Sequence, residues 1–413
     1  MEIYLVGGAV RDALLGQPIK ERDWVVVGAT PKEMLDNGFS QVGKDFPVFL
    51  HPDTKEEYAL ARKERKVAGG YHGFSFDTQT SVTLEEDLKR RDLTINAMAQ
   101  TEGGDLIDPF GGQADLSNKV LRHVSDAFSE DPVRILRVAR FAARLMPLGF
   151  QVAEETLALM QQMVQSGEVD HLVPERTWKE MVRALKEPQP VAFIQTLRAC
   201  GALQKILPEI DALYGVPQTE KWHPEIDTGI HTEMALKQAV KITEDPEIRF
   251  AVLLHDVGKG QTPKDILPSH VGHEMRGVKL IKKLCARIGV PKTYRDLSLL
   301  MAQFHTHCHK IDELKSTTVI TLLEHLDAFR RPERFQKFLL ACTADARGRK
   351  GHENEAYPQA LKLQKAFEIA KSVDVKMIVE KSPLKGEGLK NAIRQARVKA
   401  LKTQQDILFP FCF

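Results

Sequence analysis

The 413-residue sequence predicts an α+β protein. Strand-forming and helical segments alternate only over the first 120 residues, and from about residue 130 the pattern is helical almost without a break. Three prolines, Pro208, Pro217 and Pro224, mark a linker between two helical stretches. A chain of this length exceeds one ordinary core. We therefore expect four units, with the ranges 1–120, 121–227, 228–349 and 350–413.

The first unit holds the segments that predict strands. They are short, rich in β-branched and aromatic residues, and bounded by turn-forming residues. Their ranges are 3–6, 23–27, 47–50, 57–62 and 105–107. Residues 67–84 are rich in Gly, Ser and Thr and predict a mobile loop.

The rest of the chain predicts helices. In the second unit we expect them at 131–146, 153–165, 175–186 and 190–200. The block from about 229 to 348 is helical too and holds eight of the 14 histidines. The tail from residue 350 predicts further helices and ends in the apolar sequence LFPFCF.

Composition places the chain among water-soluble globular proteins. Hydrophobic residues make up 43% and charged residues 28%, and no run of about 18 apolar residues predicts a membrane span. The first residues enter a strand and lack a signal-peptide pattern. The five cysteines have no CxxC spacing, which favours free thiols in a reducing cytoplasm. The net charge of +2 excludes no partner.

The first 23 residues predict a metal and phosphate site. A short strand, 3–6, runs into Gly7-Gly8 and then a helix, an arrangement that lets backbone N–H groups approach phosphate oxygens. The next strand is expected to open with Glu21 and Asp23, which two-residue spacing would place on one face roughly 6–7 Å apart. Paired carboxylates there suit two divalent ions acting on a phosphate chain.

The sequence GGAVRD at 7–12 followed by a carboxylate-x-carboxylate strand resembles the class II tRNA nucleotidyltransferases, which include CCA-adding enzymes and bacterial poly(A) polymerases. The resemblance implies a polymerase-β-like head, a small mixed or antiparallel sheet with helices. It also implies nucleotide contacts at Gly8 and Arg11. This chain has Glu-x-Asp where most of the family has Asp-x-Asp, a mild departure because Glu also ligates Mg²⁺.

Two further head sequences fit this resemblance. RRD at 90–92 is similar to a family motif, which implies that Arg91 contacts the triphosphate or ribose and that Asp92 and Asn96 hold the loop or the ribose. The stretch DPFGGQADL at 108–116 resembles the turn that closes the head.

The helix expected at 131–146 carries an arginine stripe. Arg134, Arg137, Arg140 and Arg144 span about 120° of its circumference. Four like charges on one face repel each other, so an anionic partner is favoured over a solvated face. Asp131 and Arg134 also match the family's EDxxR motif.

In that family the Asp–Arg pair replaces a nucleic-acid template. Cytosine and adenine each present an amino donor beside a ring-nitrogen acceptor, which a carboxylate and a guanidinium match; guanine and uracil present the reverse. The resemblance thus implies that Asp131 and Arg134 admit CTP and ATP, while Arg137 and Arg140 hold phosphate. PERTWKEM at 174–181 resembles the family's helix-stabilising ERxxxE element, here Glu175, Arg176 and Glu180.

The reaction so implied is attack of a tRNA 3′-hydroxyl on the α-phosphate of CTP or ATP, with Glu21 and Asp23 holding Mg²⁺. Glu57, on a neighbouring strand, is a candidate third carboxylate, although a surface glutamate is the more ordinary interpretation.

The histidine-rich block resembles the HD-superfamily phosphohydrolases. The resemblance lies in His231, the pair His255-Asp256, and a later aspartate. It implies a phosphoester hydrolase whose metal is bound by His231, His255, Asp256 and Asp345, with Asp296 and Asp327 as alternatives to Asp345. His273 or His305 would contact phosphate. Imidazole and carboxylate ligands suit Ni²⁺, Mn²⁺ or Co²⁺ and do not choose among them.

The two parts together resemble the bacterial multifunctional CCA-adding enzymes. That resemblance implies addition and repair of the tRNA 3′-CCA end, with phosphatase, 2′-nucleotidase and 2′,3′-cyclic phosphodiesterase activities, in a cytoplasmic monomer or homodimer. An alternative is a poly(A) polymerase or a partial CC- or A-adding enzyme. Two further alternatives are a phosphohydrolase whose head only binds tRNA, and a non-catalytic RNA-binding scaffold.

Overall fold

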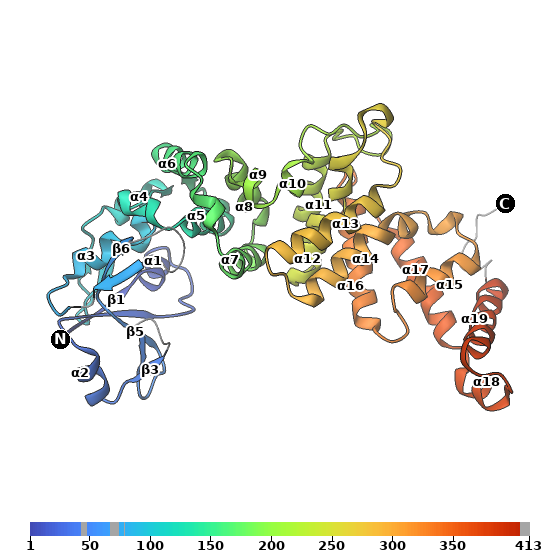
Figure 1. Ribbon diagram of the computed structural model, residues 1–413, viewed down its shortest axis with the longest axis horizontal. Coiled ribbons are helices and arrows are strands. Elements are labelled where there is room, and N and C mark those ends of the chain that lie inside the picture. Colours follow the sequence, from blue (N-terminus) through green and yellow to red (C-terminus); the bar gives the residue numbers. More distant parts are fainter. Residues whose placement is uncertain (43–47, 67–73, 78, 405–413) are drawn as a thin grey trace. The chain divides into compact units, whose positions relative to one another are not determined.

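The computed structural model describes residues 1–42, 48–66, 74–77 and 79–404. Its backbone divides into two compact units, Met1–Ile206 and Leu207–Phe413 (Figure 1). The predicted α+β class is confirmed: the strands lie in the first unit, and the second is helical. The further division into four parts stays a prediction.

The first unit is built on a seven-stranded mixed sheet. Its strand order is β3-β4-β5-β2-β1-β8-β9, in which β2 and β5 are parallel and the other neighbours antiparallel. Two further two-stranded sheets pair β6 with β7 and β10 with β11. The strands are β1 Glu2–Val6, β2 Asp23–Val27, β3 Ser40–Val42, β4 Val48–Leu50, β5 Glu57–Leu60, β6 Lys63–Lys66, β7 Phe74–Asp77, β8 Ala99–Gln100, β9 Leu106–Ile107, β10 Val120–Leu121 and β11 Gln151–Val152.

Side chains alternate in direction along β2, and each face of the sheet packs against its own hydrophobic core. Val26 packs with Met34 of α2 (Pro31–Asp36), and Val25 packs with Leu88 of α3 (Leu84–Lys89). Successive side chains of a strand point to opposite faces, so two adjacent valines serve two layers.

Two expectations about this sheet are wrong in detail. β2 begins at Asp23, so Glu21 precedes the strand. Val6 pairs with Asp23, and β1 ends there because Gly7 (φ +69°) turns the chain into the next helix, which leaves residue 21 without a strand partner. The loop expected at 67–84 contains β7 and the start of α3, while residues 67–73 and 78 lie outside the described residues.

The helices of the first unit include all four that the sequence predicts. They are α1 Gly8–Leu14, α2 Pro31–Asp36, α3 Leu84–Lys89, α4 Gly112–Asn118, α5 Val133–Leu145, α6 Glu154–Gln165, α7 Pro174–Lys186, α8 Pro190–Ala199 and α9 Ala202–Ile206. α5 packs against both α7 and α8. Its buried residues, among them Ile135, Leu136 and Val138, anchor the helix that carries the arginine stripe.

The second unit consists of ten helices within the described residues. They are α10 Pro208–Asp211, α11 Thr228–Ile242, α12 Pro246–Leu254, α13 His273–Arg287, α14 Lys292–His309, α15 Ser316–His325, α16 Pro332–Arg347, α17 Pro358–Lys371, α18 Val375–Lys381 and α19 Gly386–Thr403. One continuous core joins α11, α12, α14, α15, α16, α17 and α19. The expected tail helices are confirmed, and LFPFCF lies outside the described residues.

No described helix is both long enough and apolar enough to span a bilayer. Cys200, Cys285, Cys308 and Cys342 are free and buried, as the lack of CxxC spacing predicts.

Candidate functional site

The first unit contains a cavity of about 1170 Å³ between the β1–α1 turn, β2, α5 and α7. All but one of the residues that the sequence singles out here for nucleotide or metal binding line it, the exception being the candidate third carboxylate Glu57. Those that line it are Gly8, Arg11, Glu21, Asp23, Arg91, Asp131, Arg134, Arg137 and Arg140. Arg144 lines it as well, so the whole arginine stripe faces this cavity.

The β1–α1 turn requires glycine for two reasons. Gly7 has φ +69°, a region that L side chains rarely adopt. A Cβ at this position would also lie 3.0 Å from Nη1 of Arg91. The turn therefore brings the backbone and the Arg91 guanidinium together at the start of α1.

The two predicted metal ligands are not held in ion pairs. Among the described residues, neither Glu21 nor Asp23 forms an ion pair with a basic side chain. Desolvation and the nearby charge of Glu21 raise the pKa of Asp23, although Arg91 and Arg137 oppose the shift. Such a site fits a cation, and carboxylate oxygens are the ligands that Mg²⁺ takes.

Glu57 is Asp23's register partner in the parallel pair β2–β5. Its side chain is therefore on the same face of the sheet. Glu57 is exposed and is not among the residues that line the cavity, so the structure leaves its role as a third ligand a prediction.

Several of the cavity arginines are held by buried polar partners. Arg11 donates from Nη1 to Oδ1 of Asn96 (2.5 Å) and from Nε to Oδ1 of Asp12 (2.9 Å). Asn96 donates to Oδ1 of Asp92 (3.0 Å), whose Oδ2 accepts from Nε of Arg137 (2.6 Å). Asp92 and Asn96 thus position arginines.

This pairing fixes the charge of Asp92. Burial alone would raise the pKa of its carboxyl, but the Arg137 charge and the Asn96 hydrogen bond outweigh burial and lower that pKa well below its usual range. The Asp92 charge in turn raises the pKa of Arg137.

Asp131 is held by an arginine of another helix. Arg176 on α7 donates to it twice, from Nη2 to Oδ2 (2.6 Å) and from Nη1 to Oδ1 (3.2 Å). Arg134 donates from Nη1 to the carbonyl of Ala127 (2.7 Å). Glu180, also on α7, accepts from Nε of Arg140 (2.6 Å). The ERxxxE element thus orients two side chains of the cavity, a role that its sequence resemblance did not reveal.

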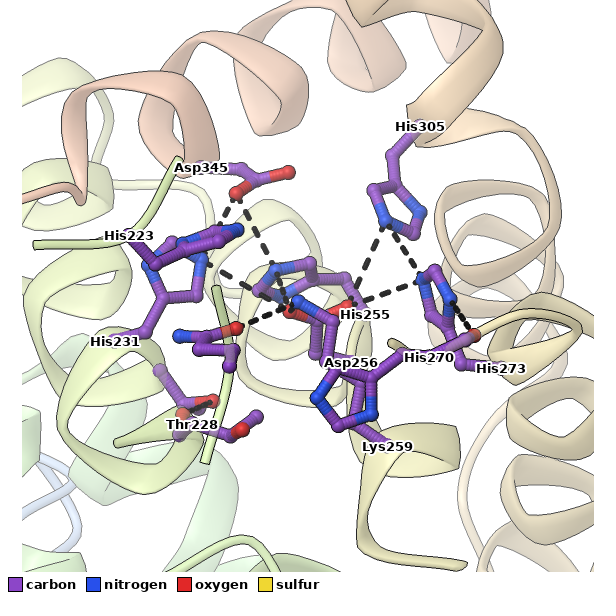
Figure 2. Close-up of polar contacts among 12 residues, drawn as sticks. His223, Thr228, His231, His255, Asp256, Lys259, His270, His273, His305 and Asp345 are labelled. Carbon is purple, nitrogen blue, oxygen red and sulfur yellow. Dashed lines mark hydrogen bonds and ion pairs between the residues drawn. The ribbon is translucent and has the colours of Figure 1, made fainter. Parts of the chain in front are cut away.

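The second unit gathers a buried cluster of histidines and carboxylates (Figure 2). Its members come from the ends of helices, where side chains converge: His231 from the first turn of α11, His255 and Asp256 directly after α12, His273 from the start of α13, His305 from α14 and Asp345 from α16. The fold thus assembles residues that span more than a hundred positions.

Packing at Gly258 sets the position of His273. A Cβ on Gly258 would lie 1.9 Å from the carbonyl oxygen of His273 and 2.5 Å from the amide nitrogen of Gly277. Gly258 lies two residues after Asp256, in the 3₁₀ turn Val257–Gln261. Only a glycine at this position therefore lets the turn pack against α13.

Asp256 lies between two groups of potential ligands (Figure 2). Its Oδ2 is 3.2 Å from Nε2 of His255 and 3.9 Å from Nε2 of His231. Asp345 completes this group, with Oδ1 3.1 Å from Nε2 of His231 and 3.4 Å from Nε2 of His255.

The second group lies around the other oxygen of Asp256. Its Oδ1 is 3.4 Å from Nε2 of His273 and 3.6 Å from Nε2 of His305. The two Nε2 atoms are 3.4 Å apart.

Backbone carbonyls fix the tautomers of three histidines when they are neutral. Nδ1 of His255 lies 2.7 Å from the carbonyl oxygen of Val252. Nδ1 of His305 lies 2.9 Å from that of Met301, and Nδ1 of His273 lies 2.9 Å from that of His270. A carbonyl only accepts, so each Nδ1 carries the proton and each Nε2 offers a lone pair. A lone pair suits a metal and not a phosphate oxygen, so the structure favours ligand roles for His273 and His305.

The cluster fits a metal on a second ground. Nε2 of His255 and Oδ1 of Asp256 are buried without a hydrogen-bond partner among the described residues. Burial lowers the pKa of His305 to about 3, which keeps its ring neutral and able to coordinate. Neutral imidazoles and carboxylates form the donor set of divalent transition ions.

The structure brings Asp345 to the histidines and leaves the two alternative aspartates elsewhere. Asp327 pairs with Arg330 (2.6 Å), and Asp296 pairs with Arg295 (3.2 Å). His309 also orients Asp345, since its Nε2 is 2.8 Å from Oδ2, while Tyr357 lies 2.8 Å from Nδ1 of the same ring.

The sequence analysis did not identify Lys259 and Glu225 as members of this site. Lys259 is buried, with Nζ 2.7 Å from Oδ2 of Asp256 and 2.9 Å from Oε1 of Gln218. Oε1 of Glu225 lies 3.0 Å from Nδ1 of His231 and forms a hydrogen bond with Nδ1 of His223 (3.0 Å). A carboxylate on the outer nitrogen of a ligating histidine fixes the ring and strengthens it as a ligand. The adjacency of Lys259 to HDVG was the only available signal for either residue.

Three protein-family models match successive parts of the chain, in the order head, helical body and histidine-rich block. Residues 3–122 match the poly A polymerase head domain, 149–214 the "Probable RNA and SrmB- binding site of polymerase A", and 228–331 the HD domain. The multifunctional CCA protein of Teredinibacter turnerae is 58% identical over 98% of this chain and 99% of its own length. That of Thioalkalivibrio sulfidiphilus is 60% identical over 97% and 98%.

A solved structure shares the fold at lower identity. The Thermotoga maritima CCA-adding enzyme complexed with tRNA aligns with a TM-score of 0.63 and 19% identity, over 99% of this chain and 90% of that one.

Proposed function

Since this chain belongs to the multifunctional CCA protein family, we propose that its first unit adds and repairs the 3′-CCA end of tRNA from CTP and ATP, and that its second unit is a metal-dependent phosphohydrolase. One observation supports the first activity most directly: a single cavity collects the carboxylates of Glu21 and Asp23 and four arginines of α5. It offers both the cation ligands and the anion contacts that nucleotidyl transfer needs.

In the head, Glu21 and Asp23 would hold Mg²⁺. When bound, Mg²⁺ would lower the pKa of the attacking 3′-hydroxyl and neutralise charge on the pyrophosphate that leaves. The triphosphate would lie against the N-terminus of α1, where Gly8, Arg11 and Arg91 face the cavity. Arg137 and Arg140, fixed by Asp92 and Glu180, would hold further phosphate oxygens without reorganising.

Base choice would fall to Asp131 and Arg134. The Asp131 carboxylate accepts from the exocyclic amino group of cytosine or adenine, and the Arg134 guanidinium donates to the adjacent ring nitrogen. Guanine and uracil would leave both groups facing like partners, which is costly in a water-poor site. Arg176 supports this selection because it holds Asp131 in one orientation.

In the second unit, His231, His255, Asp256 and Asp345 would bind a divalent transition ion such as Ni²⁺, Mn²⁺ or Co²⁺. When bound, the ion would activate water for attack on a phosphoester. His273, His305 and the second oxygen of Asp256 would provide ligands for a second ion. The backbone bonds of the histidines keep their lone pairs directed at these positions, and Lys259 adds a positive charge beside Asp256.

The substrates we propose for this second site are the 3′ ends of damaged tRNA, through phosphatase, 2′-nucleotidase and 2′,3′-cyclic phosphodiesterase activities. The Thermotoga maritima complex makes tRNA a fitting partner for the fold. In cytoplasmic tRNA repair, the second unit would clean a damaged 3′ end before the first unit adds nucleotides to it.

The test is incorporation of each labelled NTP, with Mg²⁺, into tRNA transcripts that lack CCA, CA or A. We expect ordered addition of C, C and A, with no G or U. Asp23→Ala should abolish addition and leave release of phosphate from 2′-phosphorylated RNA unchanged, while Asp256→Ala should do the reverse.

Other results would redirect the assignment. A long A tract would favour a poly(A) polymerase, and addition limited to C or to A would favour a partial enzyme. No incorporation by the wild type would make the head a binding module.

A further inference from the structure

Trp222 is an exposed aromatic residue at the wall of the phosphohydrolase cavity. The chain has three tryptophans, and Trp24 and Trp178 are partly buried, whereas 59% of Trp222 is exposed. Trp222 lines the same cavity as Asp256 and His305. Aromatic side chains that line a cavity beside a few polar groups are typical of small-molecule sites.

The segment that carries Trp222 is tied to the metal ligands. The amides of Trp222 and His223 both donate to the carbonyl of Thr219 (3.1 and 3.0 Å), which fixes a tight turn. The ring of His223 lies edge-on to His231, with centroids 4.6 Å apart. Trp222 is thus one residue away from a side chain in contact with the proposed metal centre.

Glu225 holds this segment in place from the other side. It contacts His223 and His231, and its Oε2 accepts from the amide of Lys350 (3.2 Å), beyond the C-terminus of α16. The turn with Trp222 and the chain after Asp345 therefore form two connected walls. A ligand stacked on Trp222 would meet a preformed surface.

The cavity has the size and charge for a nucleotide. Its volume is about 880 Å³, within the range of small-molecule sites. Arg347, Arg349 and His352 line it as well, and Nζ of Lys221 lies 4.8 Å from the Trp222 ring centroid. Basic groups around an aromatic face favour a phosphorylated ligand with a planar ring.

We propose that Trp222 is a stacking platform for the nucleobase of the RNA 3′-terminal nucleotide whose phosphate is hydrolysed at Asp256. The inference rests on the proposed phosphohydrolase activity. Every base has a π face, so stacking on an aromatic side chain recognises a nucleotide without selecting its sequence. It would direct the site to RNA ends and away from small phosphate esters.

The experiment compares two phosphate monoesters of secondary alcohols, adenosine 2′-monophosphate and glycerol 2-phosphate, with released phosphate as the readout. In the metal-loaded protein, Trp222→Ala should lower kcat/KM for the nucleotide about 5- to 150-fold and leave that for glycerol 2-phosphate unchanged. Trp222→Phe should restore most of the nucleotide activity.

A binding measurement separates stacking from catalysis. Adenosine 2′-monophosphate should quench the fluorescence of the metal-free wild type and not that of Trp222→Phe, in which Trp24 and Trp178 still emit. Equal losses on both esters in Trp222→Ala, or no loss on either, would overturn the proposal. A wild type that hydrolyses neither ester would contradict the phosphohydrolase assignment instead, and quenching would still test the base platform.

Discussion

Arg176 holds Asp131 through two hydrogen bonds, 2.6 and 3.2 Å long, across the contact between α7 and the segment before α5. The carboxylate that we propose reads the amino group of the incoming base is therefore oriented by an arginine 45 positions away.

Arg176→Ala should weaken base selection more than phosphate binding. Losing charge-assisted hydrogen bonds costs about 1.5–3 kcal/mol, so kcat/KM for CTP and ATP should fall about 10- to 100-fold. Incorporation of G and U should rise, measured with single NTPs on tRNA lacking CCA. Lys179→Ala, an exposed position on the same helix, is the control. Unchanged selectivity in Arg176→Ala would show that Asp131 is held by other means.

Asp92→Asn should destabilise the head in a pH-dependent way. Asp92 has a lowered pKa when folded, so its ionised form contributes stability above the unfolded pKa of about 3.9, and this contribution is lost as the pH falls through the folded pKa. We expect a loss of about 1–3 kcal/mol at pH 7, because Arg137, whose side chain is partly exposed, loses its buried charged partner. The loss should shrink below about pH 4.

Urea unfolding between pH 3 and 7 measures this difference. Trp222→Phe as the background leaves Trp24 and Trp178, both in the first unit, as the reporters. Asp36→Asn, an exposed carboxylate on α2, should show no such pH dependence. A constant difference across the range would contradict the pairing as the cause.

Glu225→Gln should weaken metal binding by the second unit. The side chain keeps its shape but no longer gives His231 an anionic partner, and loss of such a partner lowers metal affinity about 10- to 100-fold. Titration calorimetry with Ni²⁺ and the visible spectrum of bound Co²⁺ both report it. Glu355→Gln is the matched control, since Glu355 also contacts a histidine, His352, at 2.6 Å. Equal affinities in the two variants would rule out the role of Glu225.

Metal content should distinguish the two ligand groups around Asp256. After chelation and reloading, we expect two ions per wild-type chain, one in His305→Ala and none in Asp256→Ala, measured by elemental analysis. Metal at 100 times its dissociation constant should stabilise the second unit by about 2.7 kcal/mol. A single ion in both the wild type and His305→Ala would limit the site to the group with His231.

The sequence predicted those site residues that lie close together along the chain. The arginines of α5 share a face because a helix repeats every 3.6 residues, and all four line one cavity. It did not predict the partners of those residues. Arg176, Glu225 and Lys259 act through packing between distant elements, and no local periodicity reports which helices meet. The predicted range 23–27 matches β2, but the position of Glu21 outside the strand depends on where its neighbour β1 ends.

In the sequence HDVGKG, Gly258 is required for packing, whereas Asp256 and Lys259 serve the proposed chemistry. The backbone of α13 leaves no room for a side chain at that position, so any version of this helical unit needs the glycine, whether or not it hydrolyses anything. Lys259 and Asp256 carry no such steric demand. In a protein with the same fold, a surviving glycine beside a lost aspartate would thus mark a domain retained as a scaffold after its chemistry had ended.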